Sequence, residues 1–325
     1  MTGGAGFIGS HLCDALVARG DSVTVLDTLS TGRRRNLEHL LEAEDARIRL
    51  VEGAVTDEAL VDDLMQASDG CLHLASAVGV QLVVNRPLES LISNVRGTDI
   101  VLSTAARHGR RVLYTSTSEV YGKNSVGGLG EESDRILGSP FKSRWNYAIA
   151  KSFGESLAHA LYHSAGAETI VVRLFNTVGP RQTGRYGMVM PRFVQQALAG
   201  EDLTVFGEGT QSRCFAHVHD TVRGILLLLD NDDAVGDVFN IGSTREITIL
   251  DLARRVIEIT GSSSGIRLVP FDEAYGEGFE ELGRRQPDTA KLHELTGWEP
   301  LRTLDDAIED IMAHERARRG TSLAA

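Results

Sequence analysis

The sequence predicts an α/β fold in which a doubly wound parallel sheet is followed by a smaller C-terminal domain. Strand-length apolar runs alternate with helix-length segments through the first half of the chain, and a glycine-rich turn opens the first helix. After Phe175 the alternation gives way to loop-rich stretches such as residues 179–187. Continuous apolar strands that are separated by helices are typical of a parallel sheet covered on both faces.

The elements of the first half follow in a regular order. The expected strands are residues 22–26, 48–51, 70–74, 112–116 and 169–174, and the expected helices are residues 10–19, 56–66, 91–108 and 145–164. We expect the first domain to span residues 1–175 and a substrate-binding domain to span residues 176–325. Residues 215–241 could rejoin the first domain.

One expected element is missing from this order. A sheet of this kind begins with a central strand before the glycine-rich turn, but only Met1 and Thr2 precede Gly3. Removing a central strand would leave a gap of about 9–10 Å, which is two strand spacings. Either the natural start lies upstream or another segment fills the gap.

The composition excludes several classes of protein. The 325 residues carry a net charge of −12, which argues against a nucleic-acid partner. No apolar run approaches the roughly 18 residues of a membrane span and no signal peptide is visible, so we expect no membrane association. Cys13, Cys71 and Cys214 lack CxxC spacing and are expected to be reduced thiols of a cytoplasmic protein.

The glycine-rich turn indicates a dinucleotide-binding site of the Rossmann type. Gly3, Gly6 and Gly9 form a GxxGxxG pattern, which lets the backbone approach a pyrophosphate at the positive end of a helix. Asp27 ends the next strand, 18 residues after Gly9. A carboxylate there accepts hydrogen bonds from ribose hydroxyls and repels a 2′-phosphate, which favours NAD over NADP. A turn-forming Asp27 is the alternative.

A tyrosine and a lysine, Tyr147 and Lys151, lie four residues apart on one expected helix and therefore on one face. An ammonium beside a phenol of pKa about 10 favours the phenolate, which can take a proton from an alcohol. Thr117, Ser118 and Glu119 directly follow the strand at 112–116, and ligands of open α/β sheets bind beyond such strand ends. We expect all five residues to share one cleft. A surface lysine beside a half-buried aromatic ring, and a helix cap at residues 118–119, are the alternatives.

These motifs as a set resemble the extended short-chain dehydrogenase/reductases, NAD-dependent enzymes that act on nucleotide-linked sugars. The resemblance also rests on residues 73–76 (HLAS), 94–98 (NVRGT), 116–122 (STSEVYG) and 173–181 (RLFNTVGPR). It implies catalytic roles for Thr117, Ser118, Glu119, Tyr147 and Lys151. It implies NAD contacts for Gly3, Gly6, Phe7, Ile8, Gly9, Asp27, Leu74, Ala75, Asn94, Tyr147 and Lys151. Ala54 departs from the pattern, because the family often has an aspartate there near the adenine.

The trio Thr117-Ser118-Glu119 is similar to the UDP-glucuronate decarboxylase branch of this family, although GDP-mannose dehydratases share a similar trio. Residues 31–39, 203–213 and 286–300 are also similar to that branch. Such enzymes oxidise C4 of UDP-glucuronic acid and lose CO2 from the resulting β-keto acid, giving UDP-4-keto-xylose, UDP-xylose or both. A UDP-sugar 4-epimerase, then a 4,6-dehydratase, are the alternative activities, and an NAD-binding regulator is the non-enzymatic alternative.

Arginines punctuate the second half of the chain, where planar guanidinium groups suit diphosphate oxygens. The residues expected to contact a UDP-sugar are Asn176, Arg181, Arg185, Arg192, Arg213 and Arg285. The resemblance further implies a homodimer that forms through the helices at residues 91–108 and 145–164. His217 and His219, two apart on an expected strand and followed by Asp220, could suggest a metal site. No further ligand cluster is evident, and we expect no metal.

Overall fold

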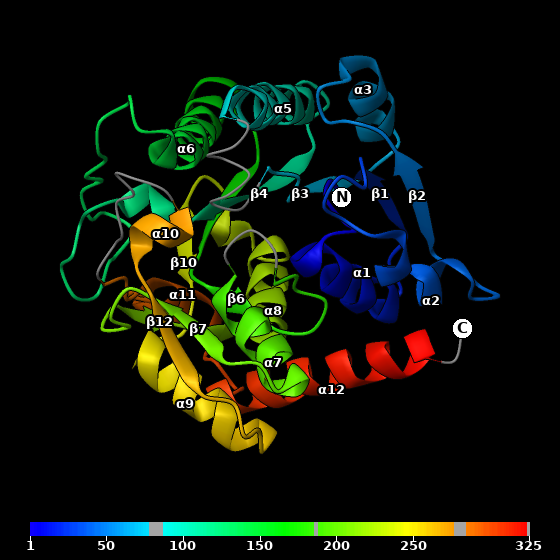
Figure 1. Ribbon diagram of the computed structural model, residues 1–325. Coiled ribbons are helices and arrows are strands. Elements are labelled where there is room, and N and C mark those ends of the chain that lie inside the picture. The colour runs from blue at the N-terminus through cyan, green and yellow to red at the C-terminus, as the bar shows by residue number, and fades with distance from the viewer. Residues whose placement is uncertain (78–86, 185–187, 276–283, 324–325) are drawn as a thin grey trace.

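A computed structural model describes residues 1–77, 87–184, 188–275 and 284–323, and its centre is a parallel β-sheet (Figure 1). The strands follow the order β2, β1, β3, β4, β5, β10, with residues 1–3 between β1 and β3. Their bounds are β1 Val23–Asp27, β2 Ile48–Glu52, β3 Gly70–His73, β4 Arg111–Thr117, β5 Thr169–Leu174 and β10 Val238–Ile241. The five strands expected in the first half are present, and no end is displaced by more than one residue.

The first three residues occupy the place of the missing central strand. The N–H of Thr2 donates to the carbonyl of Leu72 at 2.9 Å, and the N–H of Leu26 donates to the carbonyl of Met1 at 2.8 Å. Thr2 thereby bridges β1 and β3 in parallel register. Residues 1–3 thus join the two strands at their carboxyl ends, where the glycine-rich turn begins.

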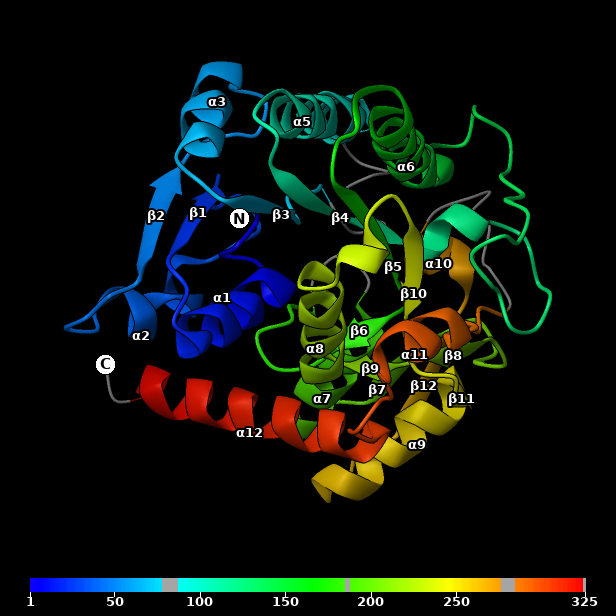
Figure 2. The ribbon, with the colours of Figure 1, turned by 180° about the vertical axis from the view of Figure 1, so that it is seen from behind.

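Helices cover both faces of the sheet (Figure 2), with α3, α5 and α6 on one face and α1 and α8 on the other. Their bounds are α1 Phe7–Arg19, α2 Glu38–Leu41, α3 Glu58–Gln66, α5 Pro87–Arg107, α6 Asn146–Ala165 and α8 Val218–Leu229. Along β4, Leu113 packs into the core on the side of α1 and α8, whereas Val112 and Tyr114 pack into the core on the opposite side. Burial on both faces explains why the strands are continuous apolar runs.

The second lobe follows β5 and has a core of its own, which includes Phe193, Leu252, Val256 and Ile308. Its helices are α7 Val189–Ala199, α9 Ile249–Thr260, α10 Phe271–Tyr275, α11 Ala290–Thr296 and α12 Leu304–Leu323. Its short strands are β6 Thr177–Val178, β7 Leu203–Phe206, β8 Ser212–Cys214, β9 Ala216–His217, β11 Glu246–Thr248 and β12 Ile266–Val269. The chain crosses back within this half, because α8 packs against α1 and β10 pairs in parallel with β5. Among the described helices, none has both the length and the apolar composition needed to cross a membrane.

Candidate active site

A cavity of about 970 Å³ lies along the carboxyl ends of the strands and extends to the second lobe. Most residues predicted from the sequence line it: Gly3, Gly6, Phe7, Ile8, Gly9, Asp27, Leu74, Ala75, Thr117, Ser118, Glu119, Tyr147, Lys151, Asn176, Arg181, Arg192, Arg213 and Arg285. Asn94 is not among the lining residues, and Arg185 lies outside the described residues.

The glycine-rich turn forms a cradle that only glycine fits. A Cβ on Gly3, whose φ is +71°, would lie 2.7 Å from the backbone nitrogen of Ala75. A Cβ on Gly9 would meet the carbonyl of Gly3 and come within 2.7 Å of the Cα of Gly4. The backbone at the start of α1 is therefore open to a pyrophosphate, as a dinucleotide requires.

Asp27 closes the outer end of this cradle. Its Oδ2 accepts the N–H of Ala5 at 3.0 Å, and its Oδ1 accepts the N–H of Leu29 at 2.8 Å. Burial raises the pKa of Asp27, and these two backbone hydrogen bonds oppose the rise. Each oxygen keeps a lone pair for a ribose hydroxyl. The expected turn role and the expected ribose role of Asp27 are thus compatible.

Asn94 supports the cavity wall from behind. Its Oδ1 accepts the hydroxyl of Ser76 at 3.0 Å and the N–H of Ala77 at 2.8 Å. Asn94 thus holds the segment that follows β3 in place, and its contact with the cofactor stays a prediction. Ser76, which sequence reasoning did not assign, lines the cavity instead.

Tyr147 and Lys151 face the cavity from the first turns of α6. The hydroxyls of Ser76 and Thr117 hydrogen-bond Tyr147, but burial and the charge of Glu119 together raise its pKa above the ordinary value. The Nζ of Lys151 donates to the carbonyl of Thr115 at 2.7 Å. Burial lowers the pKa of Lys151 to about 7. Tyr147 therefore needs an additional positive charge nearby before it ionises at neutral pH. A bound oxidised nicotinamide would provide that charge.

Glu119 is held between two arginines at the inner end of the cavity. Its Oε2 accepts from Arg144 Nη1 at 2.7 Å, and its Oε1 accepts from Arg285 Nη1. Burial opposes ionisation of Glu119, but the two guanidinium groups outweigh burial and lower its pKa to about 2. Sequence reasoning missed Arg144, although its position three residues before Tyr147 was a usable signal. The arrangement concentrates two positive charges and one negative charge beside the tyrosine.

The family follows from a comparison of sequences. Residues 1–242 match the model of the NAD dependent epimerase/dehydratase family. The chain belongs to this family. Its cofactor is NAD, and the glycine cradle and Asp27 are the residues that fit this cofactor.

Relatives of this epimerase/dehydratase family member match nearly its whole length. It is 39% identical over 311 residues to the UDP-N-acetyl-alpha-D-glucosaminuronate decarboxylase of Bacillus cytotoxicus, covering 95% of each chain. It is 36% identical over 316 residues to UDP-glucuronic acid decarboxylase 1 of Xenopus tropicalis, covering 97% of this chain and 71% of the relative. The UDP-glucuronic acid 4-epimerase of Bacillus cereus, solved with UDP-glucuronic acid and NAD, is 27% identical with a TM-score of 0.86, covering 98% of both chains.

The arginines predicted to bind substrate divide into two groups. Arg192 and Arg213 line the cavity from the second lobe, where the guanidinium of Arg192 lies 3.9 Å from the ring centre of Phe206. Arg181 borders the cavity, but its guanidinium pairs with Asp14 of α1 at 2.8 Å. Arg181, at a φ of 68°, thus anchors its loop to α1, and its contact with the substrate stays a prediction.

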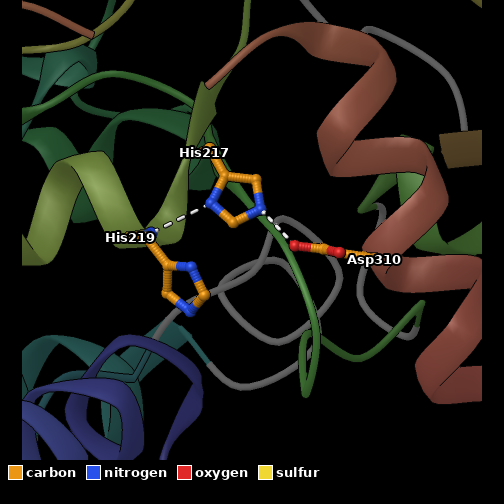
Figure 3. A group of neighbouring side chains, drawn as sticks. All are labelled: His217, His219 and Asp310. Atoms are coloured by element: carbon orange, nitrogen blue, oxygen red, sulfur yellow. Dashed lines mark hydrogen bonds and ion pairs between the residues drawn. The ribbon is translucent and has the colours of Figure 1, made fainter. Parts of the chain in front are cut away.

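His217 and His219 do not lie on one strand, as the sequence had led us to expect (Figure 3). His217 ends β9 and His219 lies in the first turn of α8, while Asp310 approaches from α12. The backbone N–H of His219 donates to Nδ1 of His217, so the ring proton of His217 lies on Nε2. From there it donates to Oδ2 of Asp310 at 3.2 Å. Metal binding through Nε2 would require removal of that proton, leaving an imidazolate, so this arrangement disfavours a metal ligand at His217.

Proposed function

We propose that this enzyme decarboxylates UDP-glucuronic acid. One observation carries the proposal: beside Tyr147, Glu119 is held between the guanidinium groups of Arg144 and Arg285. Two guanidinium groups against one carboxylate leave a positive charge in excess beside Tyr147, which suits a substrate that brings its own carboxylate better than a neutral hexose. The names of the relatives from Bacillus cytotoxicus and Xenopus tropicalis support the same reaction.

The first step is oxidation of the sugar at C4. NAD, held by the glycine-rich turn and Asp27, would supply the hydride acceptor for this step and the hydride donor for the last. Tyr147 takes the proton of the C4 hydroxyl, Lys151 favours the phenolate by its charge, and Thr117 orients the phenol through its hydroxyl. Helix α6 thus provides the base and its neighbouring charge, and β4 provides the hydroxyl.

The second step is loss of CO2 from the 4-keto sugar, which is a β-keto acid. The bond between C5 and the carboxylate carbon breaks, and its electron pair forms an enolate on the C4 oxygen. Tyr147, now protonated, and Thr117 can donate hydrogen bonds to this oxygen. C5 then takes a proton from a water molecule. Because Glu119 stays ionised far below neutral pH and would repel the substrate carboxylate, we assign Glu119 to orienting that water and Ser118 to orienting the carboxylate.

The nucleotide part of the substrate occupies the second lobe in this proposal. Asn176, Arg192 and Arg213 border the cavity there and are suited to the two phosphates. Residues 1–175 then form the NAD-binding domain and residues 176–325 form the UDP-sugar-binding domain, with α8 and β10 packed on the first. Hydride return gives UDP-xylose, and release before that step gives UDP-4-keto-xylose.

The 2-acetamido analogue of UDP-glucuronic acid is a second candidate substrate. The relative from Bacillus cytotoxicus, at 39% identity, carries the name of a decarboxylase for that analogue. Incubating the protein with each UDP-sugar and NAD, followed by mass spectrometry, tests both candidates. Loss of CO2 from either one supports decarboxylation, and the ratio of the two kcat/KM values identifies the preferred C2 substituent. An isobaric product without CO2 supports the 4-epimerase alternative.

We also propose that two copies associate through α5 and α6, which lie side by side (Figure 1). Four large apolar side chains are exposed on these helices: Leu88 at 69%, Ile92 at 49%, Ile149 at 36% and Phe153 at 39%. Leu88 and Ile92, like Ile149 and Phe153, are four residues apart and so share one face of their helix, and exposed apolar faces mark protein–protein interaction sites. A second copy of the chain would cover these side chains.

The double variant Ile149→Glu/Phe153→Glu is expected to be monomeric, because carboxylates buried at a subunit interface lose their hydration without a counter-charge. Sedimentation velocity against the wild-type protein measures this. Leu301→Glu is the matched control, since Leu301 is 72% exposed on the other lobe. A wild-type monomer, or a double variant that sediments as a dimer, would contradict the proposed interface.

A cytoplasmic location agrees with the state of the thiols. Cys13, Cys71 and Cys214 are buried and free. Burial raises the pKa of all three thiols, so they are unreactive in the folded protein. We propose that the chain works in a reducing compartment.

A further inference from the structure

A buried carboxylate that the proposed reaction does not use lies one helical turn beyond Lys151. Glu155 follows Lys151 by four residues on α6, so the two side chains share one face of the helix. Both are buried, with Lys151 3% exposed and Glu155 8% exposed. An ionised group at this depth is retained only where partners hold it.

The partners of Glu155 fix both of its oxygens. Oε1 accepts the hydroxyl of Ser116 at 2.5 Å and Nε of Arg173 at 3.0 Å, and Oε2 accepts Nη2 of Arg173 at 2.8 Å. Arg173 is itself fixed, because its Nη1 donates to the hydroxyl of Tyr121 at 2.9 Å. The carboxylate is therefore paired with a guanidinium group and held in one position, and it is tied to the ends of β4 and β5.

The remaining titratable neighbours of Lys151 cannot supply a negative charge. His73 of β3 is neutral, since burial lowers its pKa to about 3, and it cannot balance an ammonium. Tyr114 of β4 and Tyr147 of α6 present their rings to Nζ at 4.8 Å and 6.0 Å, and burial raises the pKa of both phenols, so neither carries a charge at neutral pH in the protein without NAD. Among these described groups Glu155 is the anion, and its charge raises the pKa of Lys151 against the effect of burial.

We propose that Glu155 is a positioning residue of the reaction. It keeps Lys151 in its ammonium form. Through its hydrogen bond with Ser116 it also fixes the end of β4, where the carbonyl of Thr115 accepts a hydrogen bond from that ammonium. The role of Lys151 toward Tyr147 rests on the proposed function. Glu155 itself is not among the residues that line the cavity. It acts on the tyrosine only through the lysine.

The chain offers a direct way to test this, because it contains only four lysines: Lys123, Lys142, Lys151 and Lys291. Labelling lysine with ¹³C at Cε gives four NMR signals, and the NAD-bound protein can be titrated without any sugar. In Glu155→Gln the midpoint of the Lys151 signal is expected to fall by about one pH unit. Glu155→Asp, which keeps the charge, should restore most of the shift. Glu168→Gln is the matched control, because the side chain of Glu168, which pairs with Arg111, is 51% exposed to solvent.

Activity gives a second readout with a fixed sign. Lys151 loses its charge as pH rises, so a lower midpoint moves the alkaline limb of the kcat/KM profile of Glu155→Gln to lower pH. A uniform loss of activity at every pH with an unmoved Lys151 midpoint would overturn the proposal and leave Glu155 a structural residue.

If Glu155→Gln does not fold because Arg173 is left unpaired, the double variant Glu155→Gln/Arg173→Met removes both charges. Because loss of the Arg173 charge partly offsets loss of the Glu155 charge, a smaller fall of the midpoint in the same direction is expected, and an unmoved or raised midpoint overturns the proposal. The titration uses no substrate, so it stands or fails independently of decarboxylation.

Discussion

Replacing Tyr147 by phenylalanine is expected to lower kcat by about 10²- to 10⁴-fold, the range for removal of a general acid–base group. The ring and its packing remain, so the fold and NAD affinity should be retained, and only the hydroxyl that takes the C4 proton is lost. Stopped-flow absorbance of the reduced nicotinamide measures the first step, and mass spectrometry measures the final product.

The control is Tyr162→Phe, which removes a hydroxyl from a later turn of the same helix, outside the cavity lining. It should turn over at the wild-type rate. Wild-type turnover in Tyr147→Phe would place the base elsewhere. A complete absence of sugar turnover in the wild-type protein, with NAD bound, would favour the NAD-binding regulator instead.

Replacing Arg285 by glutamine is expected to cost about 2–5 kcal/mol, which is roughly 30- to 5,000-fold in kcat/KM for UDP-glucuronic acid. Arg285 is only 7% exposed and shares Glu119 with Arg144, so its loss leaves a buried charge network incomplete and removes a candidate partner of the substrate carboxylate. Steady-state kinetics with CO2 detection measures the effect.

The neighbouring Arg284 gives a matched control. It pairs with Glu246 at 2.7 Å, is 45% exposed and does not line the cavity. Arg284→Gln should leave kcat/KM within about twofold, as expected of an exposed ion pair worth less than 1 kcal/mol. Equal losses in Arg284→Gln and Arg285→Gln would indicate a nonspecific effect of charge rather than a site for a carboxylate.

The sequence was sufficient where function depends on local pattern. The glycine turn, Asp27 and the Tyr147–Lys151 spacing are each read within one element or one turn, and the structure places them in a single cavity. The five strands were found because burial on both faces makes each an unbroken apolar run. Ser118 and Glu119 were assigned from the family resemblance, because spacing alone could not distinguish a catalytic role for these two residues from a helix cap.

What the sequence could not supply was long-range pairing. Glu119 meets Arg285 across 166 residues, and Arg181 turns to Asp14 across 167 residues, so no local pattern records either contact. The closing of the sheet by Met1–Gly3 was missed for a different reason. Three residues have no periodicity to detect, and only the bridges of Thr2 to both neighbouring strands and the backbone hydrogen bonds of residues 1–3 define their place.

The central claim is that the sugar loses its carboxylate as CO2 after oxidation at C4. The most direct measurement is incubation with UDP-glucuronic acid labelled with ¹³C in the carboxyl group, in the presence of NAD, with mass spectrometry of both gas and nucleotide products. We expect ¹³CO2 in the same amount as a UDP-pentose or its 4-keto form, and neither nucleotide product should carry the label. A labelled UDP-hexuronic acid isomer with no ¹³CO2 would contradict it and indicate a 4-epimerase.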